Sequence, residues 1–163
     1  MSDLTKQLIH EMYSRLLHLN EQRLDTELHL FLKQATVDQI TFIPKNMTAI
    51  HVIDCIGDNE PINNTAIAKR MNLSKANITK ISVKLLDEGL IKRFQLNDNK
   101  KEIYFRLTSK GKHVYELHKK LHKRKEQQFY QFLDSFSATE QEVILKFLQK
   151  LTTRIAEEQI ETT

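Results

Sequence analysis

Two histidines four residues apart form the pattern in this sequence that is best suited to chemistry. His118 and His122 have the i,i+4 spacing that places two imidazoles on one face of a helix, where both could bind the same metal ion. Lysines and arginines surround the pair, so an exposed basic helix surface is an alternative interpretation of the same residues. On spacing alone, the pair is a weak candidate for a metal site.

Positive charge is concentrated in the middle of the chain. Residues 63–125, the basic segment, contain 17 Lys/Arg and 5 Asp/Glu, a net charge of +12, whereas residues 1–62 and 126–163 each carry a net charge of −4. A surface that served only solubility would intersperse both signs of charge. The segregation therefore indicates a polyanionic partner, for which the helices and the hairpin described below predict double-stranded DNA.

The apolar residues predict a mainly helical protein. They recur every three or four residues from Leu4 to about Ala35, which predicts one long amphipathic helix. A short helix is expected from a Thr48 cap to near Gly57. Long helices are also expected after Thr108 or Ser109 and after Ser137-Ala138-Thr139-Glu140, which is a capping box. Only 3 Gly and 2 Pro occur, which leaves almost no material for glycine-rich phosphate-binding loops.

The basic segment begins with two short helices joined by a turn. Asn63 or Asn64 is expected to cap the first, over Thr65–Met71, and Ser74 is expected to cap the second, over Lys75–Glu88. A helix of this kind fits the major groove of DNA, and residues near its N-terminus reach base edges while the first helix lies against the backbone.

A hairpin is predicted after these helices. From Leu90 the apolar period changes from 3.6 to 2, and Leu90–Phe94 and Ile103–Leu107 flank the turn-rich Asn97–Lys100. The predicted fold is therefore a mainly α winged helix-turn-helix with a two-stranded wing. The predicted DNA-binding residues are Arg70, Ser74, Lys75, Asn77, Thr79, Lys80, Lys84, Lys100 and Lys101.

Three stretches of the sequence resemble the MarR family of transcription regulators. Leu73–Lys80, Leu85–Ile91 and Leu107–Gly111 look like the recognition helix, the wing and the start of the following helix in that family. The resemblance covers nearly the whole chain and implies a sequence-specific DNA-binding repressor. One departure lies at the tip of the wing, where Asn99 and Lys101 occupy the positions of the family's Asp and Arg.

Dimerisation is expected on two grounds. In the family that the sequence resembles, the first and last helices intertwine with those of a second subunit. Independently, these helices are too long to be buried by a winged-helix core, so their apolar stripes need a second copy of the chain. We expect one MarR-type domain over residues 1–163, with a DNA-binding lobe at 45–111 and a dimerisation region at 1–44 and 112–163. Two recognition helices roughly 34 Å apart would require a palindromic operator.

Within that family, the resemblance is greatest to the zinc-responsive regulators of zinc uptake, notably at Phe136–Leu148. It implies one zinc site per subunit, with zinc as a co-repressor. The implied metal ligands are Glu27, His51, His118 and His122. His29 is the alternative to Glu27. Neutral imidazoles and a carboxylate in a tetrahedral array suit Zn²⁺.

The same residues permit other functions. One alternative is a MarR-type regulator that a small organic ligand releases from DNA, and another is a helical adaptor for acidic proteins.

Cys55 permits a redox-sensor interpretation, but its sequence neighbours carry no positive charge that would lower its pKa, so an inert buried thiol is predicted. Nucleophile-elbow and HExxH motifs are absent, so we do not expect an enzyme. A single cysteine and short apolar runs predict a cytoplasmic protein without a membrane partner.

Overall fold

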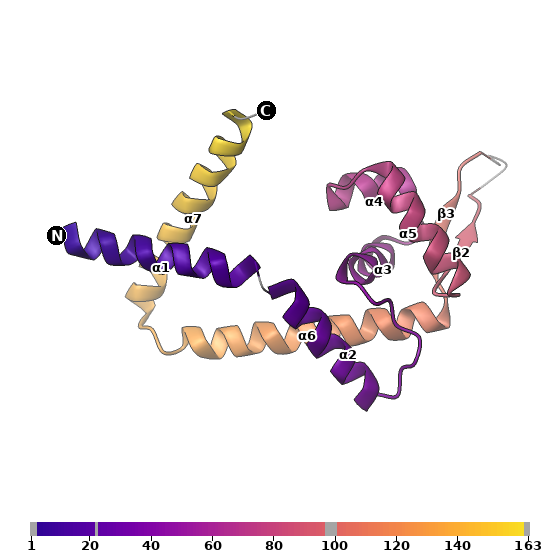
Figure 1. Ribbon diagram of the computed structural model, residues 1–163, viewed down its shortest axis with the longest axis horizontal. Helices are drawn as coiled ribbons and strands as arrows, with labels where there is room; N and C mark the ends of the chain where they lie inside the picture. Colours follow the sequence, from indigo (N-terminus) through magenta and orange to yellow (C-terminus); the bar gives the residue numbers. More distant parts are fainter. Residues whose placement is uncertain (1–2, 22, 97–100, 162–163) are drawn as a thin grey trace. The chain divides into compact units, whose positions relative to one another are not determined.

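The computed structural model describes residues 3–21, 23–96 and 101–161, and its contacts divide the chain into two compact units, Met1–Leu121 and His122–Thr163. The first unit contains α1 (Asp3–Glu21), α2 (Arg23–Val37), α3 (Met47–Asn59), β1 (Ile62–Asn63), α4 (Asn64–Met71), α5 (Lys75–Asp87), β2 (Ile91–Phe94) and β3 (Tyr104–Leu107). The helix α6 (Ser109–Leu133) begins in the first unit and ends in the second, which also contains α7 (Ala138–Glu161). The expected mainly α fold is confirmed (Figure 1).

The long N-terminal helix predicted from Leu4 to Ala35 is found as two helical segments. These segments are α1 and α2, and Gln22 between them lies outside the described residues. Inside the first unit, α2 packs against α3 and buries Phe31 and Ala35 in the core. The face of α2 that carries Phe31 and Ala35 is therefore covered, whereas large apolar side chains of α1 are exposed along its length.

The helix α3 begins and ends at residues other than those predicted. The side chain of Asn46, not Thr48, accepts the hydrogen bond from the backbone N–H of Ala49, at 2.8 Å. The helix also continues past Gly57 to Asn59. Gly57 serves a close approach between helices rather than a helix end, because a Cβ there would lie 2.5 Å from Cδ2 of Tyr115 on α6.

The two short helices form as predicted, and their caps explain why they start where they do. Asn63 accepts from the N–H of Ala66, at 2.8 Å, and Ser74 accepts from the N–H of Asn77, at 3.2 Å. Each such cap contributes about 1 kcal/mol to helix stability. Figure 1 shows α3, α4 and α5 gathered beside the strands. Their inner faces meet in a core that includes Ile50, Ile53, Ile56, Ile67, Ile78, Leu85 and Val114.

The wing belongs to a three-stranded antiparallel sheet rather than a two-stranded one. β2 pairs with β3 as predicted, and β1 pairs with the other edge of β3, with Ile62 opposite Phe105. β1 was not predicted because a two-residue strand has no alternation to recognise. The predicted turn Asn97–Lys100 lies outside the described residues, so its conformation stays a prediction.

The junction between the sheet and α6 leaves no room for a side chain. Thr108 caps α6, because its hydroxyl accepts from the N–H of Gly111 at 3.1 Å and donates to the carbonyl of Gly89 at 2.7 Å. A Cβ at Gly111 would lie 2.0 Å from the carbonyl oxygen of Leu90. The start of α6 is therefore held directly against the backbone that enters β2.

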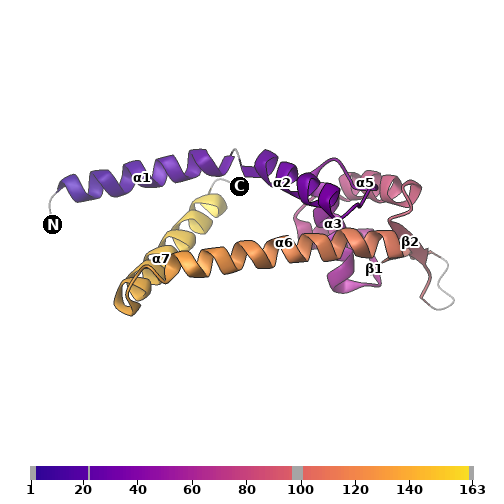
Figure 2. The ribbon, with the colours of Figure 1, turned by 90° about the horizontal axis from the view of Figure 1, so that it is seen from below.

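The predicted capping box opens α7 in the second unit. The N–H of Ser137 donates to the carboxylate of Glu140 at 2.8 Å, and the N–H of Glu140 donates to the Ser137 hydroxyl at 3.4 Å. Figure 2 shows α6 as one continuous helix. None of the described helices has an apolar stretch long enough to cross a bilayer.

Large apolar side chains are exposed on the terminal helices of the single chain. Those of α1 are Leu4, Leu8, Ile9, Met12, Leu16, Leu17 and Leu19, and those of the second unit include Phe129, Phe132, Val143, Leu145, Phe147 and Leu148. Apolar stripes of this length are unusual on the surface of a monomer and mark surfaces that another molecule covers.

Candidate nucleic-acid interface and metal centre

The predicted base-reading residues lie on an exposed surface at the start of α5. Lys75, Asn77 and Lys80 are exposed, whereas Ile78 and Leu85 of the same helix are buried. Other predicted contacts have local partners. The hydroxyl of Ser74 caps the helix. The hydroxyl of Thr79 donates to the backbone carbonyl of Lys75, one turn earlier, at 2.8 Å.

The predicted phosphate contacts are distributed over α4, α5 and the wing. Arg70 on α4 is exposed, and Lys84 on α5 lies 3.9 Å from the carboxylate of Glu88. Lys101 is exposed at the end of the wing loop, and Lys100 lies outside the described residues. The structure thus leaves the side chains of these described cations accessible to a large anion.

Two further cations of the wing were missed by the sequence analysis. Lys92 and Arg93 are both exposed on β2, although adjacent residues of a strand point to opposite faces of the sheet. Their sequence signal was the pair of adjacent cations within a predicted strand. Arg106, the neighbour of Lys92 on β3, has its guanidinium 4.1 Å from the ring centroid of Phe94, which is a cation–π contact.

The four residues that the family resemblance implied as metal ligands lie together. Glu27 is on α2 and His51 is on α3, while His118 and His122 occupy successive turns of α6. One potential ligand atom from each lies within 4.8 Å of the others. We call these four residues the Glu/His cluster. His29, the alternative to Glu27, is exposed and is not part of the group.

His118 is at the centre of the Glu/His cluster and is 2% exposed. Its Nε2 lies 3.9 Å from Oε1 of Glu27, and its ring centroid lies 5.3 Å from that of His51. Its ring and that of Phe31 also form a T-shaped pair with a centroid distance of 5.7 Å. Its orientation is therefore determined by side chains from both α2 and α3.

Asp54 is a site residue that the sequence analysis missed. Its Oδ2 lies 2.5 Å from Nδ1 of His118, on the side of the ring opposite Glu27. The signal that could have found it is its position three residues after His51, because residues three apart share a helix face.

The electrostatic environment of His51 favours its neutral form. Burial lowers the pKa of the His51 imidazole and the neighbouring His118 lowers it further, against opposing contributions from Glu27 and Asp54. A neutral imidazole is the form that binds metal. The donor set of one carboxylate and three imidazoles therefore fits a borderline metal ion such as Zn²⁺.

A second polar contact joins α3 to α6 one turn beyond Asp54. The carboxylate of Asp58 accepts from Lys119 at 2.9 Å and from the hydroxyl of Tyr115 at 2.7 Å. Burial acts to raise the pKa of Asp58, but these two hydrogen bonds outweigh it and lower the pKa. The hydrogen bond between Tyr115 and Asp58 also raises the pKa of the Tyr115 hydroxyl.

Cys55 is not an activated thiol. Burial raises the pKa of this cysteine, which outweighs the opposing effect of Arg70. The sequence neighbours of Cys55 gave no hint of Arg70, because that cation comes from α4, which packs against α3. The predicted inert character of the thiol nevertheless agrees with the direction of the shift.

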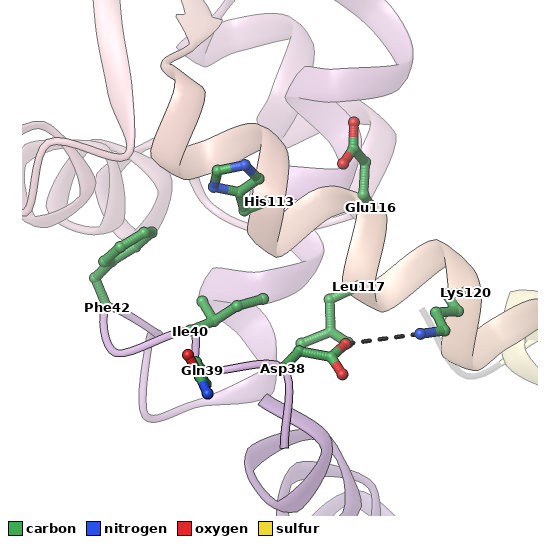
Figure 3. A pocket seen from close by; sticks show the side chains of 8 residues that line it. All are labelled: Asp38, Gln39, Ile40, Phe42, His113, Glu116, Leu117 and Lys120. Carbon is green, nitrogen blue, oxygen red and sulfur yellow. Dashed lines mark ion pairs between the residues drawn. The ribbon is translucent and has the colours of Figure 1, made fainter. Parts of the chain in front are cut away.

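A pocket of about 470 Å³ lies beside the first part of α6 (Figure 3). It combines apolar side chains with titratable ones, and Lys120 forms an ion pair with Asp38 across it at 3.7 Å. The lining residues are Asp38, Gln39, Ile40, Phe42, His113, Glu116, Leu117 and Lys120.

Comparison with known proteins agrees with this arrangement. The sequence profile of the MarR family matches residues 45–103, from just before α3 into the wing. The HTH-type transcriptional regulator PchR of Bacillus subtilis (strain 168) is 61% identical over 163 residues, which is 100% of this chain and 96% of that protein.

Two solved structures of ZitR from Lactococcus lactis are also similar. A crystal structure of ZitR, a zinc-responsive MarR family member, is 27% identical with a TM-score of 0.63 and covers 69% of this chain and 78% of ZitR. Wild-type ZitR in complex with DNA is 27% identical with a TM-score of 0.61 and covers 69% of this chain and 77% of ZitR.

Regulators of this kind bind DNA as dimers and are not enzymes. A dimer also accounts for the apolar stripes that α1 and α7 expose in the single chain. From its helix-turn-helix, its wing and its relatives, the chain belongs to the MarR family of DNA-binding transcription regulators.

Proposed function

We propose that this protein is a zinc-responsive repressor that binds a palindromic operator as a homodimer, with one zinc ion per subunit as co-repressor. The ion is held by the Glu/His cluster. The observation that supports this most directly is the convergence of one carboxylate and three imidazoles, from three helices, within 4.8 Å. The zinc-responsive character of ZitR, a solved relative, supports the same function.

The spacing of the Glu/His cluster suits a small dication. A tetrahedral zinc site with bonds of about 2.0–2.1 Å has ligand atoms roughly 3.3 Å apart. Separations of up to 4.8 Å therefore require only small side-chain rotations to reach that geometry. Glu27 contributes one negative charge directly, and Asp54 places a second one beside His118. Together these carboxylates match the charge of a divalent ion.

The ligands connect the metal site to the DNA-binding helices through α3. His51 lies on α3, which leads directly through β1 into α4 and α5, while the other ligands lie on α2 and α6. A bound zinc ion would supply a cross-link between these three helices. It would favour the conformation in which the ligands are close together, and we propose that this conformation is the one that binds the operator.

We assign DNA binding to residues 45–111 and dimerisation to residues 1–44 and 112–163. Within the first region, we propose that Ser74, Lys75, Asn77, Thr79 and Lys80 lie along base edges in the major groove. Arg70, Lys84 and Lys101 contact phosphates, together with Lys100, whose role is proposed from the sequence only. As a transcription regulator of this type, the protein acts on DNA, and we propose that it does so in the cytoplasm.

The test is an operator titration with and without zinc. A preferred duplex is first selected from a random library by the wild-type protein, in parallel with added zinc and with a chelator. Wild-type protein should bind this duplex more tightly with zinc, and His118→Ala should lose that response. His113→Ala is the matched control, because His113 is an exposed histidine of α6 outside the Glu/His cluster. Equal operator affinity with zinc and with chelator would reject zinc as the co-repressor.

The pocket beside α6 supports a second candidate function. Its mixed apolar and charged lining suits a small organic effector that would release the protein from DNA. In that case operator affinity would not respond to zinc, and substitutions at Phe42 or His113, rather than at His118, would change the response to the effector. The same titration therefore separates the two candidates.

A further inference from the structure

We propose that Asp54 is a positioning residue of the metal site. Its carboxylate holds the Nδ1–H of His118 and thereby directs Nε2 of that ring toward Glu27 and the other ligands. This inference rests on the proposed zinc site and adds to it a residue that does not itself bind the ion.

The geometry at His118 assigns a different role to each ring nitrogen. Nδ1 lies 2.5 Å from Oδ2 of Asp54, whereas Nε2 lies 3.9 Å from Oε1 of Glu27. An ionised carboxylate only accepts hydrogen bonds, so Nδ1 carries the hydrogen. In the neutral ring, Nε2 is then the nitrogen without a hydrogen, which is the form that binds a metal ion. Asp54 thus selects the tautomer of His118 that is suited to bind metal through Nε2.

Burial makes this pairing decisive for the orientation of the ring. The side chain of His118 is 2% exposed and that of Asp54 is 16% exposed, so water competes little for either group. Among the described residues, Oδ1 of Asp54 is buried without a hydrogen-bond partner. The hydrogen bond from His118 is therefore the contact that compensates for burying this carboxylate.

A carboxylate that accepts a hydrogen bond from a metal-binding histidine also changes the properties of that imidazole. It fixes the orientation of the ring and raises its basicity, and losing such a partner typically lowers metal affinity by about 10–100-fold. Because Asp54 lies one turn after His51, α3 provides both a ligand and the group that orients a second ligand on α6.

A purely structural role for Asp54 would be to hold α3 against α6. Asp58 provides the matched control for that role, since it lies one turn further along α3 and contacts Lys119 and Tyr115 of α6, which are not among the proposed ligands. Loss of helix packing alone should therefore have similar effects at both positions, whereas the proposed role predicts a difference between them.

The first measurement is zinc affinity by competition with a chromophoric chelator. Asp54→Leu removes the acceptor at similar size and should weaken zinc binding by about 10–100-fold. Asp54→Asn retains an oxygen acceptor without the charge and should recover part of the loss. Asp58→Asn should bind zinc like the wild type. Circular dichroism establishes that each variant is folded before its affinity is compared.

The second measurement uses metal-free protein and does not depend on zinc. The ring nitrogens of histidine are labelled with ¹⁵N and observed by NMR at pH 8, with His118→Gln identifying the signals of His118. In the wild type the hydrogen should be on Nδ1. In Asp54→Asn or Asp54→Leu, part of the population should shift to the Nε2–H tautomer, and in Asp58→Asn the hydrogen should stay on Nδ1.

The outcomes separate this inference from the proposed function. If the wild type binds zinc and Asp54→Leu binds it equally tightly, Asp54 has no positioning role although the zinc site stands. A hydrogen found on Nε2 in metal-free wild type would overturn the inference even if Asp54→Leu does not fold. If His118 carries its hydrogen on Nδ1 but the wild type binds no zinc, the proposed co-repressor is wrong, and with it the role of Asp54 in metal binding.

Discussion

Gly57 on α3 and Tyr115 on α6 are in direct contact, with no space for even a methyl group between the glycine and the ring. This contact lets two helices that carry proposed metal ligands approach closely. It also places the Tyr115 hydroxyl 2.7 Å from Asp58, one residue beyond the glycine. The contact therefore combines a tight apolar approach with a polar bond at its edge.

The first prediction concerns Gly57→Ala. Replacing glycine by alanine inside a helix ordinarily gains up to about 1 kcal/mol. Here the added methyl would overlap the Tyr115 ring, and overpacking of this kind costs about 1–3 kcal/mol. We expect a net loss of about 1 kcal/mol in the free energy of unfolding, measured by urea denaturation at one fixed protein concentration. Tyr115→Ala is itself destabilising, but in that background Gly57→Ala should no longer cost stability. An equal cost of Gly57→Ala with and without the Tyr115 ring would contradict this explanation.

The second prediction concerns the pH dependence of the Asp58 contact. The hydrogen bonds from Lys119 and Tyr115 lower the pKa of Asp58 in the folded protein, so the unfolded chain takes up the proton first as pH falls. The stabilisation is present above the ordinary pKa of about 3.9 and is lost as pH falls through the lower folded value. Lys119→Gln should move the pKa of Asp58 back toward its ordinary value in a carboxyl ¹³C NMR titration. An unchanged titration curve would show that Lys119 does not contribute.

The third prediction separates base contacts from phosphate contacts. Asn77→Ala should weaken binding to the selected operator by about 1–3 kcal/mol and affect random duplexes little. Arg70→Ala should weaken binding to both kinds of duplex and reduce the slope of log affinity against log salt by about 1. Lys146→Ala on α7 is the control with unchanged DNA binding. Equal effects of Asn77→Ala on operator and random DNA would contradict a base-reading role.

The fourth prediction concerns metal stoichiometry. Elemental analysis of protein purified without added metal should find one zinc per subunit, and His118→Ala and His122→Ala should each abolish it. His29→Ala should retain the metal, because His29 is exposed outside the Glu/His cluster. Stoichiometric iron, or no metal, would instead favour a different effector.

Features that depend on neighbouring residues in the chain were predictable from the sequence. The caps at Ser74 and at Ser137–Glu140 follow from local hydrogen bonding, and the hairpin strands follow from their period of two. β1 was missed because its partner β3 lies some forty residues later and its two residues carry no pattern. The N-terminal cap of α3 was predicted at the wrong residue because both Asn46 and Thr48 are suitable capping residues.

The proposed ligands were a different case, because spacing alone identified only His118 and His122. Glu27 and His51 came from the resemblance to a family, and it was the fold that brought them beside α6. Asp54 was missed because its spacing of three residues from His51 does not by itself indicate a partner on another helix. Its role arises only from the packing of α3 on α6, which places it at Nδ1 of His118.

Gly111 limits how the sequence of this protein can change during evolution. Every missense change of a glycine codon introduces a Cβ. At position 111 that atom would collide with the backbone oxygen of Leu90, which cannot move aside as a side chain could. Mutation therefore has no gradual route away from this residue. In a library that samples all twenty amino acids and is sorted for repression, glycine should be the sole survivor at that codon.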